Sequence, residues 1–187
     1  MSGAAPPRAP AARDPAVADP EVIPRGPWHA GPRVPGLRLR EIEVVADREL
    51  PVPAGAARAV VCDLASIART EVKAREVRVE PSEDGRRGSY WVRGSFAGVP
   101  WTGRFAYELH RCGFHSVNVE RRRFGIDISG GFVVTDGSRP GTCRMRHYEQ
   151  YLLPWRLVAL KPLLVAFLAW SMGPELATIT ELARARS

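Results

Sequence analysis

Lysine is scarce in this chain of 187 residues, since Lys73 and Lys161 are its only lysines and nearly all of the net charge of +7 comes from arginine. Alanine, glycine and proline are abundant, as in proteins from GC-rich genomes. An arginine content that follows from genome composition is weak evidence for a basic binding surface. We therefore do not expect nucleic acid to be a partner of this protein.

Cysteine is also scarce. The three cysteines are widely spaced and form no CxxC pair. This spacing argues against a disulfide framework and against a zinc site, and it fits reduced thiols in the cytoplasm. The N-terminus lacks the basic-then-apolar pattern of a secretion signal. We therefore expect a soluble cytoplasmic protein with no metal and no other cofactor.

The short motifs of common catalytic sites are missing as well. The chain contains no GxSxG, no HExxH and no phosphate-binding glycine loop. Its apolar content of 45% is ordinary for a globular protein, so a substantial core can form. The sequence therefore predicts a folded domain but leaves open whether it is an enzyme.

The longest apolar segment extends from Leu152 to Arg184, and we expect the rest of the fold to pack on it. Its leucines and Phe167 recur at the spacing of a helix. A membrane span is the rival interpretation. The run from Leu157 to Met172 is shorter than the roughly 18 residues that a span needs, and Lys161 and Pro162 interrupt it. A buried core helix is the better interpretation.

Two prolines should disturb this helix. Pro162 lies inside the apolar run, where it removes one backbone donor and should produce a kink. Pro174, which follows Gly173, marks a second irregularity. Beyond it the apolar stripe continues, and Glu175 is expected on the solvent side.

The N-terminal residues 1–36 contain about half of the 17 prolines, spaced among alanine, arginine and glycine. Such a segment buries too little apolar surface to offset the entropy cost of ordering it, so we predict a disordered tail. Trp28 is its one large apolar residue, and docking of this side chain on the domain is the alternative. The folded domain is then 37–187.

Strand patterns dominate the part of the chain before the long helix. Alternating apolar and polar side chains predict strands over 39–50, 71–81, 88–97, 99–111, 114–122, 124–135 and 141–153, with a short helix over 54–64. This order indicates an α+β fold, in which helices pack on one face of a meandering antiparallel sheet.

Three segments carry a family resemblance. They are the Pro51-Val52-Pro53 end of the first strand with the helix after it, Gly130–Val134 followed by Pro140-Gly141-Thr142, and the closing helix with Glu175-Leu176. The chain from about 37 to 184 thereby resembles the START-like (SRPBCC) helix-grip superfamily, in particular its polyketide cyclase/dehydrase and lipid-transport branch. The resemblance implies a curved antiparallel sheet of about seven strands wrapped around a long C-terminal helix, with an internal hydrophobic cavity. It does not choose a function, since such folds include cyclases, lipid-transfer proteins and plain binders.

Alternation along the strands predicts the side chains that face this cavity. The expected lining residues are Trp101, Phe105, Tyr107, Leu109, Val117, Ile126, Phe132, Met145 and Glu149 from the strands, and Leu164, Phe167 and Leu168 from the helix. An apolar pocket with sparse polar groups is typical of a small-molecule site.

Three polar side chains of the expected inward set are candidates for catalysis. His147 or His115 would move a proton during an enolisation or dehydration, and Tyr107 would hydrogen-bond a ligand carbonyl. Each also has a purely structural interpretation, as a satisfied core or rim residue. Glu149 either orients a histidine or is exposed at the end of its strand.

We therefore expect a protein that binds or transfers a hydrophobic small molecule, with polyketide-like compounds and lipids as the best matches. The alternative is a polyketide cyclase, aromatase or dehydratase that works by acid/base catalysis in the same cavity. A third possibility rests on Arg121-Arg122-Arg123, which is either a solvated turn or a patch for a carrier protein or an anionic membrane surface.

Overall fold

The computed structural model describes residues 37–96, 98–120 and 125–187. The predicted tail over 1–36 and the Arg121-Arg122-Arg123 cluster lie outside the described residues. The ends of the strands predicted over 88–97, 114–122 and 124–135 also lie outside the described residues, and the other predictions fall within them.

Within the described residues, seven antiparallel strands form one sheet in the order β1-β7-β6-β5-β4-β3-β2. The strands are β1 (Glu41–Leu50), β2 (Ala74–Pro81), β3 (Arg87–Phe96), β4 (Val99–His110), β5 (Gly113–Asn118), β6 (Asp127–Asp136) and β7 (Cys143–Leu152). β2 to β7 form a meander, and β1 adds to β7 at one edge.

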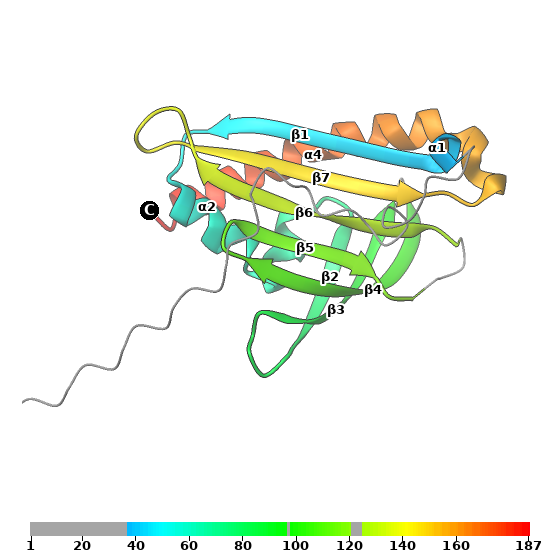
Figure 1. The fold of residues 1–187 in the computed structure, drawn as a ribbon, viewed down its shortest axis with the longest axis horizontal. Coiled ribbons are helices and arrows are strands. Elements are labelled where there is room, and N and C mark those ends of the chain that lie inside the picture. The colour runs from blue at the N-terminus through cyan, green and yellow to red at the C-terminus, as the bar shows by residue number, and fades with distance from the viewer. Residues whose placement is uncertain (1–36, 97, 121–124) are drawn as a thin grey trace, which may run out of the picture.

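The helices are α1 (Leu37–Arg40), α2 (Ala54–Val61), α3 (Ile67–Thr70) and α4 (Lys161–Arg184), with the short 3₁₀ helices η2 (Leu64–Ser66) and η3 (Trp155–Leu160). Figure 1 shows α4 running along one face of the curved sheet, behind β1 and β7, with its C-terminal end near α2. This arrangement confirms the predicted α+β helix-grip fold.

The hairpin predicted around Gly98 is present. Phe96 pairs with Val99 across β3 and β4, and Gly98 adopts a φ of 83°, which favours glycine.

A second glycine allows two strands to approach each other closely. A Cβ on Gly94 would collide with the carbonyl oxygen of Lys73, so glycine is needed where the start of β2 crosses β3. The β2 register shifts just after this point, between Ala74 and Glu76.

Three details of the long C-terminal segment differ from the sequence predictions. Pro162 lies in the first turn of α4, where its missing N–H costs no hydrogen bond, and the change from η3 to α4 occurs there instead of a kink within one helix. α4 continues through Pro174. Glu175 is completely buried and not on the solvent side, because its helix face packs against Lys73.

The interior is compactly packed at one end of α4 and less completely packed at the other. At the C-terminal end of α4, Leu176, Ile179 and Ala183 join a compact core with Val60 of α2. At the other end a smaller cluster, including Ile42 and Leu168, is bordered by side chains that are only partly buried. The structure therefore fills the space between helix and sheet at one end only.

The apolar helix from Trp155 to Arg184 is long and apolar enough to cross a membrane by length and composition. Its C-terminal half instead supplies core residues of the domain, including Met172 and Ile179. It is therefore the core helix of the fold, which is the interpretation that the sequence favoured.

Candidate functional site

A cavity of about 570 Å³ lies between the sheet and the N-terminal half of the long helix. It is lined mainly by apolar side chains, among them Val92, Phe96, Trp101, Phe105, Phe114, Ile126, Ile128, Phe132, Leu153, Leu157, Leu160, Leu164, Phe167 and Leu168. Small-molecule sites commonly have about 300–1,000 Å³ and a mostly apolar lining. The cavity therefore has the size and surface of a site for one hydrophobic molecule.

Most of the expected lining residues border this cavity. They are Trp101, Phe105, Ile126, Phe132, Glu149, Leu164, Phe167 and Leu168. Tyr107, Leu109 and Met145 have the expected inward orientation but pack in the solid core, beyond the end of the cavity. Alternation thus predicted the face of these three side chains, but it carries no information about where along a strand the hollow ends.

The orientation predicted for β5 is the reverse of the one in the structure. Tyr107 of β4 lies opposite Ser116, and directly paired residues of neighbouring strands share a face. Phe114, Ser116 and Asn118 therefore face the cavity, whereas Val117 and His115 point to the other face of the sheet. The pattern in this short strand is ambiguous because both sets contain apolar and polar residues, and pairing with β4 decides between them.

His115 and His147 consequently lie on opposite faces of the sheet. On the outer face, Nδ1 of His115 lies 2.9 Å from the hydroxyl of Tyr148, and the two rings are stacked. His147 lines the cavity, and its ring stacks on Phe132 at a centroid distance of 4.1 Å. Burial lowers the pKa of each histidine to about 4, so both are neutral at pH 7.

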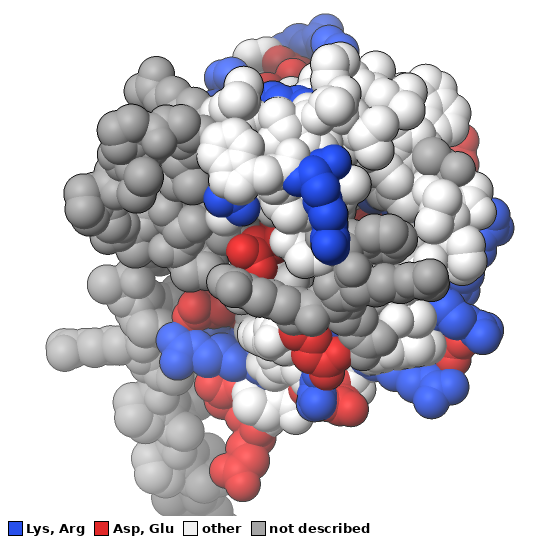
Figure 2. All heavy atoms as spheres, turned by 90° about the vertical axis from the view of Figure 1, so that its right-hand side faces the viewer, with Lys and Arg blue, Asp and Glu red and all other residues white. Residues whose placement is uncertain are grey.

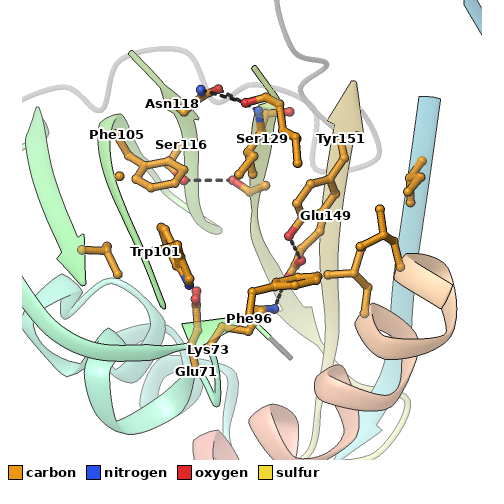
Figure 3. A pocket seen from close by; sticks show the side chains of 18 of the residues that line it. Glu71, Lys73, Phe96, Trp101, Phe105, Ser116, Asn118, Ser129, Glu149 and Tyr151 are labelled. Atoms are coloured by element: carbon orange, nitrogen blue, oxygen red, sulfur yellow. Dashed lines mark hydrogen bonds and ion pairs between the residues drawn. The ribbon is translucent and has the colours of Figure 1, made fainter. Parts of the chain in front are cut away.

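A cluster of charged side chains borders the cavity beside His147. We call Glu71, Lys73, His147, Glu149 and Glu175 the buried charge cluster. Nζ of Lys73 pairs with Glu149 and lies 3.1 Å from Oε1 of Glu175. The two ring nitrogens of His147 lie 3.5 Å from oxygens of Glu149 and of Glu175. Figure 3 shows Lys73 and Glu71 side by side, with Glu149 directed toward them from β7.

Each member of the cluster is positioned by its own element. Alternation along β7 places His147 and Glu149 on the inner face, two residues apart. Ser171 and Glu175 are separated by one helical turn and share the face of α4 toward Lys73, whose Nζ also lies 3.3 Å from Oγ of Ser171. Lys73 therefore links the start of β2 to both β7 and α4.

One ammonium group cannot balance three carboxylates. Burial opposes the charge of Glu149, but the adjacent Lys73 outweighs this effect and lowers the Glu149 pKa. For the other two carboxyl groups burial dominates, raising the pKa of Glu71 to about 7 and that of Glu175 to about 8. Burial also opposes the charge of Lys73, yet the surrounding carboxyl groups raise its pKa. At neutral pH the cluster is therefore a Lys73–Glu149 ion pair beside a mostly protonated Glu175 and a Glu71 near the midpoint of its titration.

His147, Glu149 and Glu175 also offer three potential metal ligands whose donor atoms lie within 4.8 Å of one another. The ammonium of Lys73 contacts both carboxyl groups at this place. A divalent cation would therefore have to displace the Lys73 side chain, and the donor set fits an ion pair better than a metal.

Several hydrogen-bond donors face the cavity. The indole N–H of Trp101 is buried and has no partner among the residues that the structure describes. The Tyr90 hydroxyl donates to Oγ of Ser116 at 2.9 Å, and the Tyr151 hydroxyl donates to Glu149 at 2.5 Å. Figure 3 shows Trp101 beside Glu71 and Lys73, with Ser116 and Asn118 toward the opposite end. The Trp101 N–H can thus donate a hydrogen bond to a ligand oxygen.

Sequence reasoning missed Lys73, Glu71 and Glu175. The segment 71–73 was assigned to a strand, and Glu175 to the solvent side. One signal in the sequence could have drawn attention to Lys73. The chain is rich in arginine and has only two lysines, and one of them is at position 73. No local pattern could have placed Lys73 beside Glu149, 76 residues away in the sequence.

Several solved structures share this architecture. TTHA0849 from Thermus thermophilus matches with a TM-score of 0.65 and 18% identity over 78% of this chain and 99% of that protein. The Zhui aromatase/cyclase from Streptomyces sp. R1128 matches with a TM-score of 0.67 and 12% identity over 78% of this chain and 95% of that protein. A START superfamily protein from Mycobacterium smegmatis matches with a TM-score of 0.63 and 10% identity over 78% of this chain and 99% of that protein. No family model and no curated protein matches the sequence. At these identities the likeness shows the fold.

Proposed function

We propose, from the START-like helix-grip fold of this chain and its cavity, that the protein binds a hydrophobic small molecule between the sheet and α4. The observation that carries the proposal is an apolar cavity of about 570 Å³. Burying a ligand there removes apolar surface of both the ligand and the cavity wall from water, and this contributes about 25 cal/mol per Å² to the binding free energy. Polyketide-like compounds and lipids fit this description, and the cytoplasm is the expected place of action.

The polar part of the lining narrows the ligand class. Lys73, the Trp101 N–H and the protonated form of Glu71 are all hydrogen-bond donors at one region of the cavity. Lys73 already has Glu149, Glu175 and Ser171 as partners, whereas the buried Trp101 N–H has none among the described residues and favours a ligand that brings an oxygen acceptor. We therefore propose a ligand with an apolar body and a carbonyl or carboxylate group, as in a fatty acid or a poly-β-ketone.

Filling the cavity should abolish binding. In Leu164→Trp a larger side chain occupies the ligand volume, and the affinity for a fluorescent fatty acid or polycyclic aromatic probe should fall at least about tenfold, which corresponds to the loss of roughly two methylene contacts. Titration by fluorescence measures the effect. Ala166→Trp is the matched control, since it adds the same ring to the exposed side of α4. Absence of saturable probe binding to the unmodified protein would contradict the proposal.

A second candidate function is catalysis of polyketide cyclisation or dehydration, and the location of His147 favours it. Its neutral imidazole borders the cavity and lies 3.5 Å from the ionised Glu149. It can take a proton from the carbon between two ligand carbonyls and later return it to an alkoxide oxygen, with Glu149 stabilising the imidazolium. A carrier protein that delivers the substrate would then be a further partner.

The two histidines provide the test of this second function. His147→Asn should lower product formation from a poly-β-ketone by about 10² or more, because it removes a positioned acid/base group. His115→Asn should leave the rate within about twofold, since that ring lies on the other face of the sheet. Chromatography of the products measures both rates. Equal rates for the two variants would exclude His147 as the acid/base residue.

A further inference from the structure

Large apolar side chains are exposed around the N-terminal end of the long helix. The exposed fractions are 68% for Leu163, 62% for Trp170 and 61% for Trp155, and Leu160 is about half exposed. Leu39 of α1 is also exposed and is held beside them, since Lys161 donates to its carbonyl at 3.4 Å. We call Leu39, Trp155, Leu160, Leu163 and Trp170 the end patch.

This exposure is unusual for a helix of such composition. Only 17% of the most apolar 18-residue window between Trp155 and Arg184 is buried. Several exposed tryptophan and leucine side chains on one short segment indicate an interaction surface, because water contact with them is unfavourable. The end patch therefore needs a partner that the described residues do not supply.

The charges near the end patch indicate the kind of partner. From Leu152 to Pro174 the sequence contains Arg156 and Lys161 but no acidic residue. The guanidinium of Arg40 lies 5.4 Å from the centre of the Trp155 ring. Figure 2 looks onto this end of the molecule and shows a broad, mainly uncharged area with scattered basic side chains, with acidic side chains mostly below it. Tryptophan combined with basic residues is typical of segments that lie at the surface of anionic membranes.

The end patch also adjoins the cavity. Leu160 and Leu163 are exposed on the surface and line the cavity as well. The wall formed by η3 and the start of α4 thus separates the cavity from the outer surface by a single layer of side chains. A hydrophobic ligand that crosses this wall would pass directly into the apolar layer of a membrane in contact with the patch.

We propose that the end patch docks on the surface of an anionic membrane, with η3 and the first turns of α4 in the headgroup region. The helix does not span the bilayer in this arrangement, because its C-terminal half is fixed in the protein core by Leu176 and Ile179 and by the contact of Glu175 with Lys73. The proposal concerns the outer surface and does not require a particular ligand.

Co-sedimentation of the full chain with vesicles tests the proposal. The vesicles are phosphatidylcholine containing about 30% phosphatidylglycerol, compared with phosphatidylcholine alone. We expect binding to the anionic vesicles that weakens about tenfold or more in Trp155→Ser/Trp170→Ser. Arg156→Glu/Lys161→Glu should weaken it by at least about fivefold per reversed charge, because each substitution removes an attraction and adds a repulsion. Val45→Ser, which replaces an exposed apolar residue of β1, should leave binding unchanged.

Several outcomes would overturn the proposal. These are the absence of binding to anionic vesicles, equal binding of the tryptophan variant and the unmodified protein, or equal binding to neutral vesicles. Dimerisation that the tryptophan substitutions abolish would instead assign the end patch to a second copy of this chain. Both tryptophans lie outside the cavity lining, so loss of vesicle binding with retained probe binding separates this proposal from the proposed function.

Discussion

Lys73→Met is expected to lower the free energy of unfolding by about 3 to 5 kcal/mol at pH 7, the range found when one partner of a buried ion pair is removed. The Lys73 ammonium is the group that keeps Glu149 ionised in a buried position. Without it, Glu149 must either carry an unbalanced charge or bind a proton. Urea unfolding followed by circular dichroism measures the change.

The chain supplies a matched control for this substitution. Lys161 is the only other lysine and is partly exposed at the start of α4, so Lys161→Met should change the unfolding free energy by less than about 0.5 kcal/mol. Adding Glu149→Gln to Lys73→Met should restore part of the loss, because the unbalanced charge is removed with its partner. Similar stabilities of the two single lysine variants would mean that Lys73 does not hold the cluster together.

Glu175→Gln is expected to become more stable than the unmodified protein as the pH rises. In the folded protein burial raises the pKa of Glu175 to about 8, against an ordinary value of 4.5. Between these values the folded chain retains a proton that the unfolded chain releases. The contribution of protonated Glu175 to the free energy of unfolding is therefore fully present below pH 4.5 and is lost as the pH rises through 8.

The difference in unfolding free energy between Glu175→Gln and the unmodified protein isolates this effect. It should change by about 3 to 4 kcal/mol in favour of the variant from pH 5 to pH 9, at about 1.4 kcal/mol per pH unit. Groups that do not contact Glu175 titrate alike in both proteins, so their contributions cancel in the difference. Urea unfolding at a series of pH values provides the curve. A difference that stays constant from pH 5 to pH 9 would show that Glu175 is ionised throughout.

The outline of the fold was predictable from local patterns. The seven strands, the short helix after Pro53 and the long C-terminal helix follow from alternation, turn residues and apolar periodicity, each of which acts within a few residues. The inward faces of β4, β6 and β7 were predictable for the same reason. β5 was not, because its two faces are equally mixed in polarity and its orientation is set by pairing with β4.

The site itself was only partly predictable. The apolar lining follows from alternation, but the buried charge cluster joins residues from three distant segments, and its charges are compatible with burial only because they meet. From the sequence alone, Glu175 resembles a solvent-facing glutamate and Lys73 a surface lysine.

By itself the amino-acid sequence determined that a seven-stranded sheet and a long apolar helix form, because hydrophobic periodicity fixes which faces avoid water. Only the tertiary structure decided that the space between them is solid near α2 and hollow near η3, and that one buried lysine is shared among three carboxyl groups. Cavity volume and electrostatic balance both depend on distances between segments far apart in the chain, and no local pattern encodes those distances.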